Sequence, residues 1–358
     1  MRKNFLKLFA FFSILSMPLF AAGKTVSVTT EVQSIDKHGN LNLSITSSTL
    51  ATKGFSVTDI VTVKVESAKF TAPVVNDYTD VESGSYLVRV NGQEVSIAIN
   101  SGNISSMIGA KIGSKVTITQ KEHYGYLTTF HLRLLKKDDD RKHFSSDEVF
   151  ANFREVKNNN IASGRLYRFY NPLENNPRAQ YASSLMEAKG VQVIINVANT
   201  KEDMVTTYPM TTYYKNLAEN SKVCFLNMGS SFTDESFNEK LKDALTFIAD
   251  NPCEVYGIHG KESKNRVGYV VAILQAITGS TIDEIINEYM LSFENLYGVQ
   301  KNRAQYDELA KSVKYMFANI NGGKMPNDKN LQKVVEKYLL KNVGLSAAKL
   351  EALKANLD

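Results

Sequence analysis

The residues of this sequence that are best suited to carry out chemistry lie at positions 253–268, in the stretch CEVYGIHGKESKNRVG. The alternating valine and isoleucine of 254–258 predict a short buried strand, and the apolar run that follows as far as position 279 predicts a buried helix. The polar loop between them would point backbone N–H groups and the positive end of the helix at one spot. Arg266, in the first helical turn, could hold two oxygens of an anion at once. This stretch therefore predicts an anion site, and phosphate is the anion that suits it.

Residues 259–268, HGKESKNRVG, resemble the signature loop HCxxGKDRTG of the bacterial secreted tyrosine phosphatases, which belong to the cysteine-dependent superfamily. In that superfamily a cysteine six positions before the arginine attacks phosphorus as a thiolate and forms a phosphocysteine intermediate. Position 260 of this chain is glycine, which has no side chain that could form the bond. The resemblance implies a phosphate-binding loop made of His259, Gly260, Lys261, Glu262, Ser263, Lys264, Asn265 and Arg266.

Two further departures from the signature accompany the missing nucleophile. Val267 replaces the hydroxyl residue that helps the thiolate to leave, and Asn265 replaces an aspartate. The groups that remain, His259, Lys264, Arg266 and the loop backbone, belong to the binding half of such a site. Removing a catalytic nucleophile costs about a million-fold in turnover in a serine protease. We therefore predict a phosphatase fold without phosphatase chemistry; a cysteine misread as glycine, one base away, is the alternative.

Other segments extend the resemblance from about residue 147 to the C-terminus. Residues 150–154 (FANFR), 163–168 (SGRLYR) and 190–197 (GVQVIINV) match, in order, the family motifs NFRDxG, GxLYRS and GIKTVINL. The resemblance implies that Arg154 and Arg168 support the phosphate pocket, although pairing with buried carboxylates explains these arginines equally well. A general acid would come from a neighbouring loop. Asp234 or Asp203 could supply it, but each is also explained as an acidic residue at a helix N-terminus.

The elements needed to position this loop are those of an α/β domain. Strands at 191–197, 222–228 and 254–258 alternate with helices at 203–219, 234–250 and 267–278, which predicts a doubly wound parallel sheet. Such sheets bind ligands at the carboxyl ends of their strands, where the signature loop falls. We assign residues 147–300 to a domain of the cysteine-dependent tyrosine phosphatase type and 301–358 to a helical C-terminal extension.

Residues 24–135 show the alternation of a different fold. Segments 25–36, 40–46, 60–67, 85–91, 94–100, 115–121 and 126–134 predict the strands of a small antiparallel barrel or sandwich. Residues 35–41, 78–84 and 97–103 are similar to the C-terminal β domain of the S-adenosylmethionine hydroxide adenosyltransferases. That similarity maps ligand-holding roles to Asp36 and Asn40, but the partner catalytic domain is missing. We favour a turn stabilised by local side-chain hydrogen bonds.

The N-terminus and the composition restrict location and partners. Residues 1–23, with a basic start and an apolar run at 8–20, predict a signal peptide and a secreted or periplasmic protein, an uncleaved anchor being the alternative. Without Arg2, Lys3 and Lys7, 39 basic residues face 37 acidic ones, a balance that argues against nucleic acid. The five histidines form no ligand pattern, so no metal or other cofactor is expected. Residues 136–146 are predicted to form a charged, solvated linker. The sequence does not decide whether its two cysteines, Cys224 and Cys253, form a disulfide.

Three functions remain open at this point. The leading hypothesis is an exported, catalytically impaired phosphatase-like protein that binds a phosphorylated small molecule or a phosphoprotein. The second is an active phosphatase for phosphotyrosine, a phosphoinositide or an inositol phosphate, with water or His259 in place of the cysteine. The third is a structural or adhesion protein in which the β module carries the function.

Overall fold

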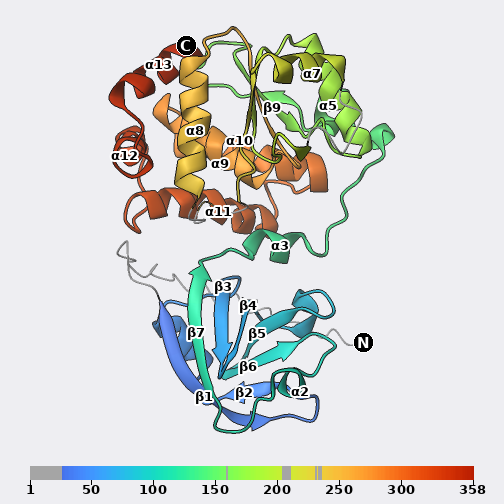
Figure 1. The fold of residues 1–358 in the computed structure, drawn as a ribbon, viewed down its shortest axis with the longest axis vertical. Coiled ribbons are helices and arrows are strands. Elements are labelled where there is room, and N and C mark those ends of the chain that lie inside the picture. Colours follow the sequence, from blue (N-terminus) through green and yellow to red (C-terminus); the bar gives the residue numbers. More distant parts are fainter. Residues whose placement is uncertain (1–25, 159, 204–210, 230–231, 233–235) are drawn as a thin grey trace, which may run out of the picture.

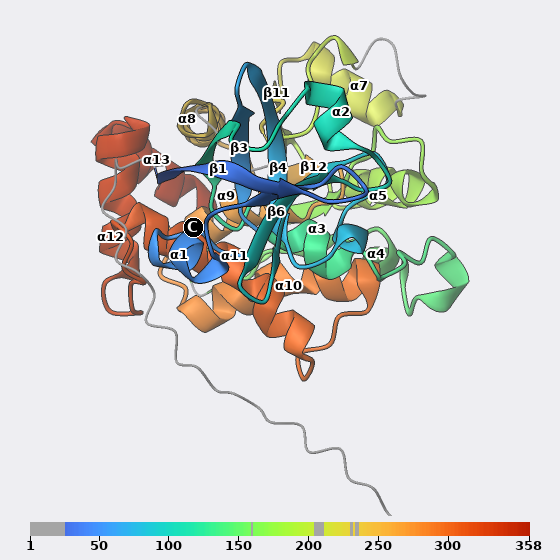
Figure 2. The ribbon, with the colours of Figure 1, turned by 90° about the horizontal axis from the view of Figure 1, so that it is seen from below.

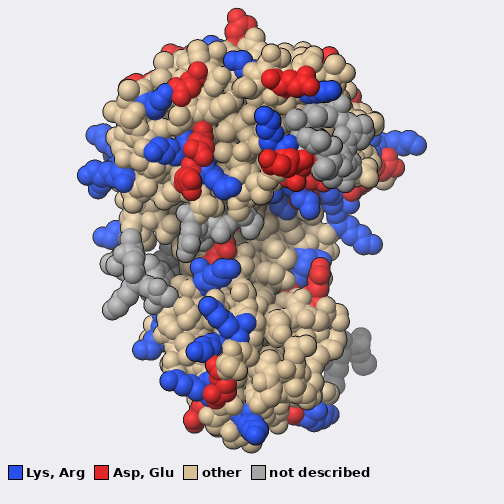
Figure 3. Space-filling model, in the orientation of Figure 1, with Lys and Arg blue, Asp and Glu red and all other residues tan. Residues whose placement is uncertain are grey.

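The computed structural model describes residues 26–158, 160–203, 211–229, 232 and 236–358. The predicted signal peptide and Asp234 lie outside these residues. The chain forms two lobes joined at a waist (Figures 1 and 3): an N-terminal closed β barrel and a C-terminal α/β domain. The predicted two-domain layout, a β barrel followed by a phosphatase-like α/β domain, is confirmed. Figure 3 shows lysine, arginine, aspartate and glutamate interspersed over the face in view, with no field of a single sign.

Seven strands close the barrel in the order β1-β2-β6-β5-β4-β3-β7. On β3 the side chains of Val61, Val63 and Val65 are buried while the residues between them are not, as the period of a strand requires. The strands and the short helices between them are β1 (Ser27–Ile35), β2 (Leu41–Leu43), α1 (Ser47–Thr52), β3 (Ile60–Val65), β4 (Ala68–Val75), β5 (Tyr86–Asn91), β6 (Glu94–Ile99), α2 (Ile104–Ile108) and β7 (Lys115–Glu122).

The prediction of an all-antiparallel barrel is wrong at one pairing. β4 and β5 are parallel, with Val74 opposite Val88, and the segment that connects them includes the 3-10 turn Tyr78–Asp80. β4 itself was not predicted. It contains Pro73, and a proline within an apolar run normally argues against a strand.

The predicted last strand, 126–134, is instead a helix, α3 (Leu127–Leu132), that lies between the two lobes (Figure 1). Tyr126 and Phe130, four residues apart, pack on a small apolar cluster of the barrel. Leu132 and Leu135, three residues apart, pack on the core of the second domain. Residues three or four apart lie on the same face of a helix. As a helix, this segment can therefore pack one pair of side chains on each lobe, and these contacts decide its structure.

The second domain is built on a five-stranded sheet in the order β11-β10-β12-β9-β8, in which β8 alone runs antiparallel to its neighbour. On β10, Val193 and Ile195 join one core cluster and Ile194 joins another, so apolar residues cover both faces of the sheet. Its strands are β8 (Arg154–Glu155), β9 (Leu166–Tyr170), β10 (Val193–Asn196), β11 (Val223–Phe225) and β12 (Tyr256–Gly260).

Helices surround this sheet. Figure 2 shows α5 and α7 on one side of the molecule and α8, α12 and α13 on the other. The helices are α4 (Asp147–Phe150), α5 (Pro177–Ala188), α7 (Thr212–Glu219), α8 (Phe237–Asp250), α9 (Asn265–Ile277), α10 (Ile282–Tyr297), α11 (Ala304–Ile320), α12 (Leu331–Tyr338) and α13 (Ala347–Leu357), with a 3-10 turn at Arg141–His143 and a π-helical turn at Leu339–Val343.

The C-terminal segment is part of the domain core. Leu331, Val335, Leu350 and Leu353 are buried with the residues of α8 and α9 in one cluster. The backbone N–H of Ala162 donates to the carbonyl oxygen of Leu357 at 2.8 Å, which ties the last helix to the start of the domain. Among the described residues, no helix is long and apolar enough to cross a membrane.

Candidate functional site

The signature loop, residues 259–266, joins the end of β12 to the start of α9. The strand ends at Gly260 and the helix begins at Asn265, so both lie two residues from their predicted positions. Within the described part of the chain, the backbone N–H groups of Lys261, Glu262 and Lys264 have no acceptor. Four loop residues followed by a helix N-terminus thus leave several donors for an anion.

Gly260, at the position that the sequence resemblance assigns to the nucleophile, is buried and tightly packed. A Cβ atom added there would lie 2.7 Å from Val197 Cγ2 and 3.1 Å from Val267 Cγ2. The first distance is shorter than real contacts of this kind, so a side chain at 260 needs Val197 to move. The backbone φ of Gly260 lies outside the left-handed region, so the obstacle is lack of space and not backbone strain.

Arg266 lies beside Gly260, with its guanidinium half-buried. Its Nη1 donates to the carbonyl oxygens of Met228, at 2.9 Å, and Val197, at 3.4 Å. Burial lowers the pKa of Arg266, and the carboxylate of Glu174 acts in the opposite direction. No carboxylate among the described residues forms an ion pair with it. We call Val197, Met228, Gly260 and Arg266 the mouth of the loop.

His259 is fully buried under the loop and does not face the mouth. Its Nε2 is 2.9 Å from the hydroxyl of Tyr214, which also accepts a hydrogen bond from Asn196 Nδ2 at 3.1 Å. Burial lowers the pKa of His259 to about 3, so the imidazole is neutral near pH 7. A neutral ring enclosed by Tyr214 and Phe169 suits packing better than the phosphate contact, or the substitute nucleophile, that the sequence suggested.

Arg168 supports the loop from behind and has no exposed surface. Its Nε donates to Ser263 Oγ at 3.2 Å, and its Nη2 donates to the carbonyl oxygens of Ser263 and Lys264. Its Nη1 donates to Glu288 Oε2 at 2.7 Å. Burial lowers the pKa of Arg168 to about 10 despite this carboxylate, which leaves the guanidinium charged at neutral pH.

Ser263 holds a backbone conformation that normally favours glycine. Its φ is +51°, and the family signature has glycine at this position. The side chain is nevertheless buried and bonded, because its Oγ accepts from Arg168. The energetic cost of the strained φ is thus offset in part by the hydrogen bond that Ser263 accepts from Arg168, behind the loop.

Arg154 completes the support together with Asn152, Glu288 and Ser292. Its Nε donates to Glu288 Oε1 at 2.7 Å and its Nη1 to Asn152 Oδ1 at 2.6 Å. Asn152 Nδ2 in turn donates to the carbonyl oxygen of Glu262 at 3.0 Å. Burial alone would raise the pKa of Glu288, but Arg154 and Arg168 hold it below its usual value. We call Asn152, Arg154, Arg168, Glu288 and Ser292 the brace.

The outer rim of the loop carries a second, more exposed charge cluster. Glu262 Oε2 is 3.0 Å from Lys264 Nζ, and its Oε1 is 3.2 Å from Lys137 Nζ. Lys137 belongs to the interdomain linker, whose Asp139 also pairs with the buried Arg178 at 2.9 Å. The linker, which we expected to be solvated, is therefore largely exposed but fixed to the second domain at two points. Lys261 is exposed, and Asn265 Nδ2 donates to Thr128 of α3 at 3.4 Å.

Gly268, in the first part of α9, allows close contact with α10. A Cβ atom at this position would lie 2.5 Å from Tyr289 Cδ2. The ring of Tyr289 therefore packs directly on the backbone of α9, near the brace residues Glu288 and Ser292 of the same helix. This glycine keeps the helix that follows the loop against the helix that supplies the brace.

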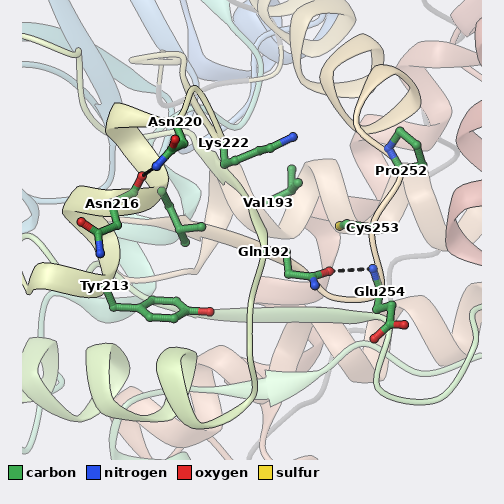
Figure 4. A pocket seen from close by; sticks show the side chains of 10 residues that line it. Gln192, Val193, Tyr213, Asn216, Asn220, Lys222, Pro252, Cys253 and Glu254 are labelled. Carbon is green, nitrogen blue, oxygen red and sulfur yellow. Dashed lines mark hydrogen bonds between the residues drawn. The ribbon is translucent and has the colours of Figure 1, made fainter.

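A wide groove of about 690 Å³ lies at the opposite edge of the sheet (Figure 4). Its side chains come from the segments that precede β10, β11 and β12, among them Gln192, Lys222 and Glu254. Gln192 Oε1 accepts from the backbone N–H of Glu254 at 2.8 Å. Since ligands of parallel α/β sheets bind at the carboxyl ends of the strands, this groove lies at the wrong edge to serve the signature loop.

The remaining candidates do not add to the site. Asp203 caps its own turn, because its Oδ2 accepts from the backbone N–H of Thr200 at 2.8 Å. In the barrel, Asp36 accepts from the backbone N–H groups of His38, at 2.8 Å, and Asn40, at 2.9 Å, as the turn interpretation predicted. No group of three or more potential metal ligands occurs among the described residues.

The two cysteines do not form a disulfide. Cys224 and Cys253 are both free thiols in this structure. Burial raises the pKa of Cys224 to about 12 and also raises that of Cys253, so neither is a reactive thiolate near pH 7.

Comparison with known protein families decides the family of the second domain. The model of the tyrosine phosphatase family matches residues 148–358, more than half of the chain. The chain belongs to the tyrosine phosphatase family. Residues 30–117 match the model of the SAM hydroxide adenosyltransferase C-terminal domain, which covers most of the barrel. The family match includes the C-terminal helices that we had set apart as an extension.

Solved structures give weaker likenesses, and no curated protein matches the chain. An uncharacterized conserved protein from Thermotoga maritima is 29% identical over 27% of this chain and 38% of its own, with a TM-score of 0.25. A conserved hypothetical protein from Thermus thermophilus is 19% identical over 28% of this chain and 37% of its own, with a TM-score of 0.20. The chain thus covers less than two fifths of either protein.

A third likeness is to the core catalytic domain of the PP-IP phosphatase Siw14 from S. cerevisiae. It is 17% identical and covers 49% of this chain and 96% of its own, with a TM-score of 0.28.

Sequence reasoning assigned no role in the site to five residues that form it: Asn152, Val197, Met228, Glu288 and Ser292. Glu288 and Ser292 had a usable signal, because they lie four residues apart on a helix face that is otherwise apolar, with Ile285 and Tyr289. A carboxylate on such a face indicates a buried partner. Val197 gave no signal, since its contact with position 260 depends on how two neighbouring strands align.

Proposed function

We propose that this member of the tyrosine phosphatase family binds phosphorylated ligands through the signature loop without hydrolysing them. The observation that carries the proposal is the packing at Gly260. The nucleophile is absent, and Val197 occupies the space into which a Cβ atom would extend, 2.7 Å away. A site that had lost only its sulfur would keep room for it; here the surroundings have closed on the glycine.

The groups that would bind phosphate remain in place. Backbone N–H groups of the loop lack acceptors within the described chain, and α9 adds the positive end of its dipole. Arg266 is held at the mouth by two carbonyl oxygens, with no paired carboxylate among the described residues. The brace, which has no role in bond-making, is complete. These features support binding, and they give no support to a substitute nucleophile, because His259 is buried and neutral.

Calorimetry with inorganic phosphate and with vanadate tests the binding half of the proposal. Arg266→Ala should weaken binding about tenfold or more, because a hydrogen bond to a charged group contributes about 1.5–3 kcal/mol. Arg303→Ala, which removes an exposed arginine of the same domain, should leave binding unchanged. Absence of binding to the wild-type protein, or equal binding by Arg266→Ala, would refute it.

Turnover of an aryl phosphate tests the catalytic half. The natural protein should show none, and Gly260→Cys combined with Val197→Ala should show turnover that disappears when Arg266→Ala is added. The Val197→Ala change makes room for the thiol, and a thiolate at a helix N-terminus is stabilised. Arginine-dependent turnover by the natural protein would show that it is an active phosphatase with another nucleophile.

A further inference from the structure

A row of lysines follows the free side of α12 and of the π-helical turn after it. We call lysine row the exposed lysines that recur here at every fourth residue: Lys329, Lys333, Lys337 and Lys341. Buried apolar residues recur at the same interval, two positions further on: Leu331, Val335, Leu339 and Val343. A shift of two residues is about 200° around an α-helix. The lysine row therefore lies on the side opposite the domain core.

Carboxylates close to the lysine row are engaged elsewhere. Glu336 is the one acidic residue within 329–343, and its Oε1 is 2.7 Å from Lys354 Nζ of α13. Asp328, just before the row, accepts from the backbone N–H of Ile282 at 2.8 Å. Within the described part of the chain, no lysine of the row forms an ion pair. Like charges four residues apart repel on a helix surface, so the row is a positive strip without compensation.

Two neighbouring side chains add to this strip. A Cβ atom added to Gly344, directly after the π-helical turn, would lie 3.7 Å from Nζ of Lys242, an exposed lysine of α8. Leu340, next to the last lysine of the row, keeps 40% of its surface exposed. α12 lies at the outer margin of the domain in both ribbon views (Figures 1 and 2), and the charged side chains that Figure 3 shows at this left margin are basic.

We propose that the lysine row binds the surface of a membrane that contains anionic lipids. Each lysine close to such a surface strengthens binding about fivefold. Lysine is a point charge on a flexible stem, which suits mobile head groups, whereas arginine suits a phosphate held in a fixed geometry. Leu340 favours lipid over a polynucleotide, because an apolar side chain leaves water when it enters the head-group region. The surface includes no residue of the mouth, the brace or the rim of the signature loop.

Sedimentation with vesicles tests this proposal. The protein is used as residues 24–358, which keep both domains and lack the apolar segment 8–20. Vesicles of phosphatidylglycerol and phosphatidylcholine in equal parts should bind it about tenfold or more tightly than vesicles of phosphatidylcholine alone. Binding should fall as salt is added, because salt screens exposed charges. Equal binding to the two kinds of vesicle, or no binding to the mixed one, would overturn the proposal.

Paired charge variants locate the binding surface. Lys333→Gln combined with Lys337→Gln should weaken binding to the mixed vesicles about thirtyfold. Lys64→Gln combined with Lys111→Gln removes the same charge from exposed positions of the barrel and should weaken binding less than about threefold. Thermal unfolding of each variant confirms that it is folded. An equal loss in the two double variants would show that only the total charge counts, and would reject the lysine row as the surface.

A last pair of variants separates lipid from other anions. Leu340→Gln should weaken binding to the mixed vesicles about threefold, because its apolar surface no longer leaves water. Unchanged vesicle binding by Leu340→Gln, or tighter binding of the wild type to duplex DNA than to the mixed vesicles, would show that the assignment to lipid is wrong. Arg266→Ala should bind vesicles like the wild type, whatever its effect on phosphate binding. Loss of vesicle binding in that variant would place the binding at the signature loop and refute the proposal.

Discussion

The two sides of the signature loop differ sharply. The brace behind it holds two arginines, a glutamate and two small polar residues, all with little or no exposure and all hydrogen-bonded to one another or to the loop backbone. The mouth in front of it has a glycine, Gly260, with a valine packed on it. The backbone shape of the loop is thus maintained by residues that take no part in bond-making.

This difference has a physical reason. Removing one member of a buried ionic network leaves the other charges without partners, so each brace residue is needed for folding as long as the others remain. A nucleophile at the mouth has no such partners, and its loss leaves a space that a neighbouring side chain can fill. Under the proposed function, the loop would thus keep its shape through the brace although no nucleophile is present at the mouth.

The largest expected effect is on the brace. Glu288→Gln leaves Arg154 and Arg168 buried without a counter-ion and should cost about 3–5 kcal/mol in the free energy of unfolding. Urea denaturation measures this cost. Glu294→Gln, an exposed change on the same helix, is the control and should stay within about 0.5 kcal/mol of the wild type. A cost below about 1 kcal/mol for Glu288→Gln would mean that the brace does not depend on its charge.

At the mouth, Gly260→Ala and Gly260→Cys should each cost about 1–3 kcal/mol in the free energy of unfolding, because the added Cβ overpacks against Val197. A double-mutant cycle with Val197→Ala should give a favourable coupling of about 1 kcal/mol, since the smaller residue removes the clash. Additive effects would show that Val197 does not limit the space at position 260. The close packing at Gly260 would then no longer support the proposed lack of phosphatase activity.

The sequence predicted the parts of this comparison that depend on local pattern. The alternation of strands and helices placed the loop at the carboxyl end of a central strand. The family resemblance implied that Arg154 and Arg168 support the loop, with pairing to buried carboxylates as the alternative. The sequence could not show which carboxylate pairs with them, since Glu288 lies 120 residues from Arg168 along the chain. Contacts between distant segments also decided the errors: α3 is a helix because it packs on two lobes, and β4 is a strand despite Pro73.

His259, below the loop, should make stability depend on pH. Its pKa is about 3 in the folded protein, below the 6.5 of an ordinary histidine, so between these values only the unfolded chain binds the proton. Stability should therefore fall as the pH falls from about 6.5. Between pH 7 and pH 5 the wild type should lose about 1–2 kcal/mol more than His259→Gln, measured by urea denaturation at each pH. Equal losses would show that the ring is not held neutral in the folded state.

The smallest effect is expected at the rim, where charges also pair but remain partly exposed. Lys137 and Glu262 keep 21% and 19% of their side-chain surface, compared with 0% and 9% for Arg168 and Glu288. Lys137→Met should therefore cost only about 0.2–1 kcal/mol, less at high salt, whereas the cost of Glu288→Gln should hardly change with salt. Lys157→Met, whose lysine is 76% exposed in its pair with Glu155, serves as the control and should have no measurable effect. If Lys137→Met cost as much free energy of unfolding as Glu288→Gln, the linker would stabilise the loop as much as the brace does. The distinction between a brace that is essential for folding and a rim that is not would then be wrong.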